Sequence, residues 1–290
     1  MLAHAYLAAG LLPHDRFPQT TTEPATAWMR AALRLWETQA PFVVAAIALV
    51  LGLLVFTTLR MRAQRAKDAA PAVNSPLVAL WTLLPLVAIA LIAWPVLQAR
   101  LAPPAAREPA LKIHVIGHQW WWEFQYPEHG FATATELHVP VGKPVELTLE
   151  SADVQHSLWI PAIGPREDVP PLERRSFTFT ADRTGSFKGQ CAELCGASHA
   201  HMHLTLVVQE PAAFDAWLAN QRAPYVAPTD SVGAGPYWRG KRVFEMHACR
   251  GCHTVRGLTE GPIGPDLTHF ASRSSIAGGM FPIGCSRRIS

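Results

Sequence analysis

The segment from Gly189 to Met202 reads GQCAELCGASHAHM and brings two thiols, a carboxylate, two imidazoles and a thioether into one short stretch. Sulfur and imidazole ligands at this density suit copper, zinc or an iron–sulfur cluster. A disulfide between Cys191 and Cys195 is the alternative interpretation. The identity of a metal therefore has to be decided by residues elsewhere in the chain.

The composition is lean in charge for a purely soluble protein. Of the 290 residues, 49% are hydrophobic and 16% are charged, which favours a membrane-attached protein of two or three domains. The net charge of +3, without a basic run, argues against nucleic acid as a partner. The cysteines form two close pairs and one single residue, a pattern typical of metal or cofactor sites. They are Cys191, Cys195, Cys249, Cys252 and Cys285.

Two long uncharged runs predict a transmembrane hairpin over residues 40–100 and membrane lipid as a partner. The first, residues 40–59, is long enough to cross the hydrocarbon core of a bilayer. The second, residues 75–98, contains prolines, which membrane helices tolerate. Arg60, Arg62 and Arg65 lie between the runs, so the positive-inside rule places this connection in the cytoplasm and both termini outside.

Residues 1–39 are expected to form an N-terminal segment with a short helix at the membrane interface. Thr22, Glu23 and Pro24 resemble a helix start, and Trp28 and Trp36 suit an interfacial anchor. A degenerate or cleaved signal peptide is the alternative for the first residues, MLAHAYLAAGLLPHDRF.

Residues 110–210 change to short alternating segments separated by Gly, Pro and Asp. We expect strands over residues 136–141, 145–149, 176–180 and 203–208, which is the pattern of an all-β sandwich. Within it, DVQHS places His156 where the end of a strand can reach the CAELC loop.

In these segments the chain resembles subunit II of the haem-copper cytochrome c oxidases. The shared segments are LWTLLP in the second apolar run, GHQWWWEF, DVQHS and GQCAELCGASHAHM, in family order across about residues 25 to 210. The resemblance implies a cupredoxin-like sandwich that carries the dinuclear copper centre CuA.

The resemblance also implies a role for each ligand. Cys191 and Cys195 would bridge both coppers, and His156 and His199 would each bind one. Met202 would be a weak thioether ligand, and Glu193 would bind through its main-chain carbonyl.

A structural zinc site is the main alternative for this loop. It would use the two cysteines with His199 and either His201 or His203. Such a site has no use for the DVQHS segment upstream. We expect His201 and His203 to be polar positions on a strand that enters the sandwich.

Two further roles follow from the resemblance alone. The Glu193 carboxylate would help to bind Mg at the contact with subunit I, and the alternative is an ordinary solvated glutamate. Trp120 would receive electrons from cytochrome c, whereas a sandwich tryptophan is more often a core residue. Trp121 and Trp122 are expected to face opposite ways along a strand.

The chain departs from the family pattern at two positions. Val78 occupies the place of a family glutamate near a proton path, so this chain is not expected to supply that carboxylate. Leu172 stands where a turn glycine is expected, which puts the local turn in doubt.

A second cofactor signal follows a short amphipathic helix and a linker over residues 211–235. Cys249, Cys252 and His253 form C-x-x-C-H, the attachment pattern of c-type haem, with His253 as the proximal ligand. A thioredoxin-like pair followed by a chance histidine is the alternative. By resemblance to small cytochromes c, the carbonyl of Pro265 would accept the ring N–H of His253.

Residues 236–290 are expected to form a partial all-α cytochrome c domain. Met280 lies in AGGMFP, which does not match a ligand loop, and the ending IGCSRRIS with Cys285 looks foreign to the family. We therefore predict a truncated haem domain without its distal iron ligand.

The resemblance predicts an electron-input subunit of a proton-pumping terminal oxidase in a bacterial inner membrane. Cytochrome c would be the donor, and haem a of subunit I the acceptor. A truncated copper-binding product that does not assemble is the main alternative. A quinol oxidase subunit would lack the copper ligands, whereas all six ligand positions are present here. A nitrous oxide reductase would share the copper loop, but it needs a large catalytic domain for which this chain has no room.

Overall fold

The computed structural model describes residues 19–64, 75–101, 111–224, 226–227, 235–261, 263–278 and 281–283. The chain divides into two compact units, one made essentially of Arg30–Ala106 and the other of Leu2–Met29 with Arg107–Ser290. The predictions for Met280, Cys285 and the first 18 residues lie outside the described residues.

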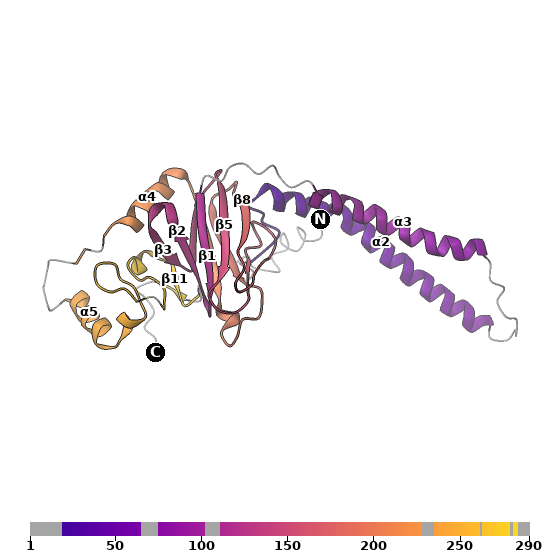
Figure 1. Cartoon of the computed structure of the whole chain (residues 1–290). Helices are drawn as coiled ribbons and strands as arrows, with labels where there is room; N and C mark the ends of the chain where they lie inside the picture. Colours follow the sequence, from indigo (N-terminus) through magenta and orange to yellow (C-terminus); the bar gives the residue numbers. More distant parts are fainter. Residues whose placement is uncertain are drawn as a thin grey trace. The chain divides into compact units, whose positions relative to one another are not determined.

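The apolar unit consists of two helices, α2 (Ala27–Gln64) and α3 (Ser75–Leu101) (Figure 1). Within the described ranges one helix, over Ala27–Arg60, is long and apolar enough to cross a membrane, and its most apolar 18-residue window has a mean hydropathy of 2.8. In α3 the apolar stretch is shorter, Ala79–Pro95. Phe42 and Leu91 expose 70% and 71% of their surface, so these helices present apolar side chains outward.

The helix expected near the N-terminus is the first part of α2, which runs without a break from Ala27 to Gln64. Its place at a membrane interface stays a prediction. The stretch before Pro41 is rich in Ala, Leu and Arg, which are strong helix formers. Pro41 lies inside α2 without ending it, as prolines do in apolar helices when the freed carbonyl finds another partner.

Ten strands build a β-sandwich in the second unit. They are β1 (Leu111–His118), β2 (Trp121–Tyr126), β3 (Phe131–Ala134), β4 (Glu136–Pro140), β5 (Pro144–Ser151), β6 (His156–Trp159), β7 (Glu167–Val169), β8 (Arg175–Thr180), β9 (Gly185–Cys191) and β10 (His203–Gln209). They form two five-stranded sheets, ordered β3-β2-β1-β5-β8 and β4-β10-β9-β6-β7. The four strands predicted from alternation correspond to β4, β5, β8 and β10.

Alternating burial places the core between the two sheets. Every second residue of β1 and β5 is buried, and these two strands pair in parallel with Leu111 opposite Val145. On β2, Trp122, Phe124 and Tyr126 are completely buried. The β-sandwich expected over residues 110–210 is therefore present.

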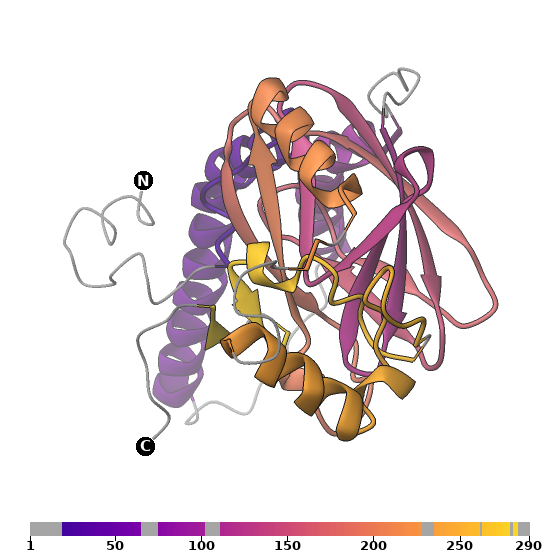
Figure 2. The same ribbon diagram turned by 90° about the vertical axis from the view of Figure 1, so that its left-hand side faces the viewer.

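The predicted amphipathic helix is α4 (Pro211–Arg222), which contacts β4 (Figure 2). It buries Phe214 and Leu218, and Trp217 stacks on His138 with ring centroids 4.2 Å apart. Behind that stack, the hydroxyl of Tyr126 donates to the carbonyl of His138 at 2.8 Å. α4 is thus part of the sandwich's hydrophobic core.

The segment after the linker contains α5 (Pro236–Met246), the 3₁₀ turns η4 (Cys249–Gly251) and η5 (Phe270–Ser272), and a small ribbon of β11 (Ser275–Ile276) and β12 (Phe281–Pro282). Among the described residues this segment holds one α-helix, so its all-α character stays a prediction. It contacts the sandwich: the N–H of Ser274 donates to Glu136 Oε1 at 2.7 Å, and that of His203 to the Gly278 carbonyl at 3.1 Å.

Candidate metal centre

The second sheet positions the predicted copper ligands from three of its strands. His156 begins β6, Cys191 ends β9, and Met202 immediately precedes β10. The loop between β9 and β10 carries Cys195 and the 3₁₀ turn η3 (His199–His201). Because β6 and β10 both pair with β9, residues far apart in the sequence meet at one end of this sheet.

The thiols and imidazoles lie in mutual contact. Cys191 Sγ lies 3.8 Å from Cys195 Sγ and 3.8 Å from His156 Nδ1. Cys195 Sγ lies 3.5 Å from His199 Nδ1. The ligand atoms of His156, Cys191 and Cys195 all lie within 4.8 Å of one another and all three residues are buried, so they can hold a metal ion.

The two weaker donors of the predicted set lie at the same place. Met202 is completely buried, and its Sδ lies 3.8 Å from Cys195 Sγ. The main-chain carbonyl of Glu193 accepts a hydrogen bond from Cys191 Sγ at 3.2 Å. Two thiols, two imidazoles, a thioether and a carbonyl suit a soft or borderline metal such as copper.

His156 is held in one orientation by its surroundings. Its Nε2 lies 2.7 Å from Asp153 Oδ1, so the N–H of this ring nitrogen donates to the carboxylate and Nδ1 faces the thiols. The ring also packs against Gly117, where a Cβ would lie 2.8 Å from Cδ2 of His156. Asp153 belongs to the DVQHS segment, but sequence reasoning gave it no role.

Burial and proximity push the two thiol pKa values apart. Burial would raise the pKa of Cys191, but its contacts with His156 and the Glu193 carbonyl outweigh burial and lower it. Burial and the neighbouring Cys191 thiolate raise the pKa of Cys195. Since copper binds thiolates, loading both thiols would release protons.

Comparison with known proteins decides the family. The family described as "Cytochrome C oxidase subunit II, periplasmic domain" matches residues 130–210. Cytochrome c oxidase subunit 2 of Cereibacter sphaeroides is 34% identical, with 73% of that protein and 62% of this chain covered. This chain belongs to the cytochrome c oxidase subunit II family. The predicted family is therefore confirmed.

A second relative agrees with this assignment, and one solved domain is also similar in sequence. Cytochrome c oxidase subunit 2 of Alkalihalophilus pseudofirmus is 36% identical over 71% of this chain, and the chain spans 60% of that protein's length. The periplasmic domain of subunit II from Bradyrhizobium japonicum, a crystal structure, is 32% identical with a TM-score of 0.39. That match covers 40% of this chain and 96% of the crystallised domain.

In this subunit II chain the aromatic segment touches the metal loop. Trp120 is half-buried, and its Nε1 donates to the carbonyl of Cys195 at 3.2 Å. As predicted, the next two tryptophans face opposite ways: Trp121 stacks on His118 at 4.2 Å, while Trp122 is buried with its ring edge toward His156 at 5.9 Å.

The Glu193 side chain does not form a magnesium site within the described part of the chain. Its carboxylate lies 3.6 Å from Nη1 of Arg166, which also donates to the Ala192 carbonyl at 3.2 Å. A single carboxylate beside a guanidinium leaves most of the oxygen ligands of Mg²⁺ to be supplied from elsewhere. A cavity of about 570 Å³ beside Arg166, Cys191 and His199 leaves this side of the cluster open.

His201 and His203, the two histidines considered for a zinc site, lie beside the cluster. Within the described contacts, neither reaches its thiols. His201 is the last residue of η3 rather than a strand residue, which corrects the prediction for it. His203 begins β10 as expected, and its Nδ1 lies 3.5 Å from Gln19 Nε2. Burial lowers the pKa of His203.

The C-x-x-C-H residues lie around η4, with Cys249 half-buried and Cys252 exposed. His253 Nδ1 lies 3.0 Å from the carbonyl oxygen of Pro265, the partner expected for it. A Cβ on Gly264 would lie 2.6 Å from the His253 ring, so this approach needs glycine. These residues fit the covalent attachment of a haem through the two thiols. The contact at Nδ1 fixes the orientation of the His253 ring.

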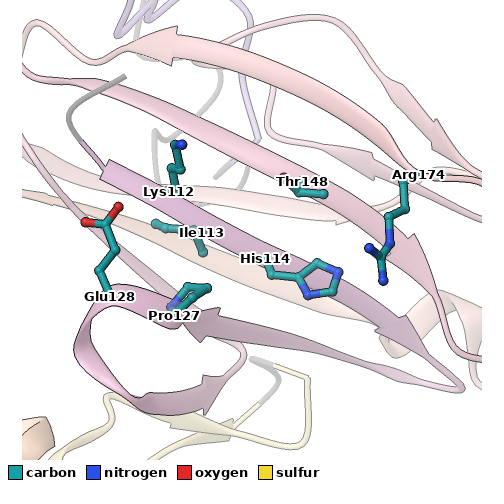
Figure 3. Close-up of a pocket in the computed structure, with 7 residues that line it drawn as sticks. All are labelled: Lys112, Ile113, His114, Pro127, Glu128, Thr148 and Arg174. Carbon is teal, nitrogen blue, oxygen red and sulfur yellow. The ribbon is translucent and has the colours of Figure 1, made fainter. Parts of the chain in front are cut away.

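A pocket on the first sheet is unrelated to the cluster. This pocket of about 260 Å³ lies over β1 and β5 and includes Lys112, His114 and Arg174 (Figure 3). Glu150 lies 3.0 Å from His114 Nε2 and 2.9 Å from Arg174 Nε. Because Glu150 already pairs with both His114 and Arg174, neither of these two side chains is left unpaired for a ligand.

Proposed function

We propose that this chain is the electron-input subunit of a haem-copper terminal oxidase. It would take electrons from cytochrome c and deliver them to haem a of subunit I, where oxygen is reduced to water with proton pumping. The observation that carries the proposal is the convergence of two thiols, two imidazoles and a thioether at one buried end of the sandwich.

A dinuclear copper centre, CuA, would supply reversible one-electron chemistry at this place. Cys191 and Cys195 would bridge the coppers, with His156 and His199 as terminal ligands. Met202 would contribute a weak thioether and Glu193 its main-chain carbonyl. Asp153 fixes the donor nitrogen of His156, and the buried β frame limits rearrangement of the ligands between redox states.

Trp120 would be the electron-input residue, because its indole reaches both the domain surface and the Cys195 carbonyl. Haem c would attach at Cys249 and Cys252 with His253 as proximal ligand, as an additional carrier in the domain over residues 236–290. Mg would bind at Glu193 only with oxygen ligands from subunit I.

The apolar helices would anchor the chain as a two-helix hairpin in a bacterial inner membrane. The connecting loop would lie in the cytoplasm and the sandwich on the outer side. A second candidate function is a copper-binding product that does not assemble into an oxidase. Co-purification with a subunit I that carries haem separates the two.

The test replaces one cysteine by serine at each of the two proposed cofactor sites. Cys191→Ser in the full chain is expected to abolish dinuclear copper and its visible copper–thiolate absorption, while covalent haem is retained. Cys252→Ser is the matched control, expected to retain both coppers and lose normal haem attachment. Metal analysis, visible spectra and haem staining of denatured protein provide the readouts. Unchanged copper content in Cys191→Ser would contradict the proposed centre.

A further inference from the structure

The main-chain carbonyl of Cys195 is held by two N–H donors from another part of the chain. Gln119 Nε2 donates to this oxygen at 2.7 Å and Trp120 Nε1 donates at 3.2 Å. Both donors come from the turn that joins β1 to β2 in the opposite sheet. Two donors use both lone pairs of a carbonyl oxygen, so this turn fixes the main chain at a proposed copper ligand.

Gln119 also contacts the segment that carries His156, another proposed copper ligand. Its main-chain N–H donates to Asp153 Oδ2 at 2.7 Å. The second oxygen of that carboxylate accepts from His156 Nε2 at 2.7 Å. A continuous set of hydrogen bonds therefore runs from His156 through Asp153 and Gln119 to Cys195.

The loop between β9 and β10 has a glycine at the point where Gln119 and Trp120 pack against it. At Gly196, directly after Cys195, a Cβ would lie 3.0 Å from Gln119 Nε2 and 3.2 Å from the Trp120 ring. The φ angle of Gly196 is +122°, a conformation that L side chains rarely adopt. Glycine thus lets the loop settle against the Gln119 amide.

We infer that Gln119 is a positioning residue for the copper centre, holding the Cys195 loop at a fixed place relative to Asp153 and His156. The inference rests on the proposed function for its copper, whereas the hydrogen bonds themselves join protein groups. Gln119 itself is exposed, so the competing interpretation is a surface glutamine whose contacts contribute nothing.

The experiment compares Gln119→Leu with Gln125→Leu in the full chain in detergent. Gln125 is a matched control because its amide donates to Glu123 Oε1 at 2.7 Å on β2, a bond that does not involve the metal loop. Amide hydrogen exchange of the metal-free proteins is measured in peptides over residues 193–198. Loss of one hydrogen bond is expected to speed exchange there about fivefold in Gln119→Leu alone.

The copper readouts follow on the same proteins. Gln119→Leu is expected to lose about tenfold in copper affinity in competition with a chromophoric chelator. Its copper–thiolate absorption bands should shift, which a general loss of stability would not produce. Gln125→Leu should match the parent chain in affinity and spectrum.

The outcomes separate the two proposals. Exchange over residues 193–198 that is equal in Gln119→Leu and the parent chain overturns the positioning role, whatever the copper results. Faster exchange with unchanged copper affinity and spectrum also overturns it. If Gln119→Leu speeds exchange but the parent chain takes up no copper, Gln119 does position the Cys195 loop and the proposed function is refuted instead.

Discussion

At the scale of single residues, the arrangement of the proposed metal ligands depends on neighbouring residues that are not themselves proposed ligands. Asp153 sets the orientation of His156 through a 2.7 Å contact, and Gly117 leaves room for its ring. The proximity of the proposed ligands could be predicted from the sequence because their types and spacing follow a motif. Asp153, Gln119 and Arg166 could not, because their contacts appear only once distant segments fold together.

Leu172, where a turn glycine was expected, has a left-handed conformation. Its φ is 66°, and its side chain is fully exposed. A branched residue in this region of φ is strained by about 1 kcal/mol or more, because Cβ approaches the following carbonyl. The turn therefore holds Leu172 in a strained conformation, at an energetic cost.

Replacing Leu172 with Gly is expected to raise the free energy of unfolding by about 1 kcal/mol, since the strain disappears and no buried contact is lost. Urea unfolding of the full chain, followed by tryptophan fluorescence, provides the measurement. Leu172→Ala keeps the Cβ and should stay within about 0.5 kcal/mol of the parent. A Gly variant no more stable than the Ala variant would show that the turn is unstrained.

At the scale of secondary-structure elements, hydrophobic alternation predicted four of the strands of the sandwich and missed the shortest ones. β4, β5, β8 and β10 have clear hydrophobic alternation, whereas β6 and β7 have four and three residues and too little pattern to identify. The parallel pairing of β1 with β5 depends on contacts between distant segments. The merging of two expected helices into α2 arises because the helix-forming sequence has no break before Pro41.

The edge strand β4 carries a carboxylate that links the sandwich to the C-terminal segment. Glu136 is buried, which would raise its pKa, but hydrogen bonds from His138 and Ser274 outweigh burial and lower it. Arg273 adds a favourable charge interaction with Glu136. A carboxylate whose folded pKa is lowered stabilises the fold above its unfolded pKa of about 4.3, and this contribution disappears as pH falls through the folded pKa.

Glu136→Gln is therefore expected to destabilise the sandwich by roughly 1–2 kcal/mol at pH 7, and this effect should shrink as the pH is lowered from about 4.3 towards 3. Urea midpoints measured at intervals between these pH values test the sign and the window. Glu146→Gln on β5 serves as the control for removing a glutamate charge. A loss of stability in Glu136→Gln that is the same at both ends of the pH range would exclude ionisation as the cause.

At the scale of the whole molecule, the proposed centre would join parts of the chain that otherwise meet only through sheet pairing. Its ligands come from the start of β6, the end of β9 and the residue before β10. A metal held by all three would resist separation of these strands. Because the unfolded chain does not present this arrangement, the free energy of metal binding becomes free energy of folding.

Removing copper should therefore lower the thermal stability of the sandwich. With free copper at about a thousand times its dissociation constant, the folded state gains roughly 4 kcal/mol, which corresponds to a rise in Tm of roughly 10 °C or more for a domain of this size. Calorimetry of the full chain before and after chelation measures this shift. Cys191→Ser, with one bridging thiol gone, should show no copper-dependent rise. An equal rise in the parent and in Cys191→Ser would place the stabilising copper at some other site, since both proteins keep the remaining histidines.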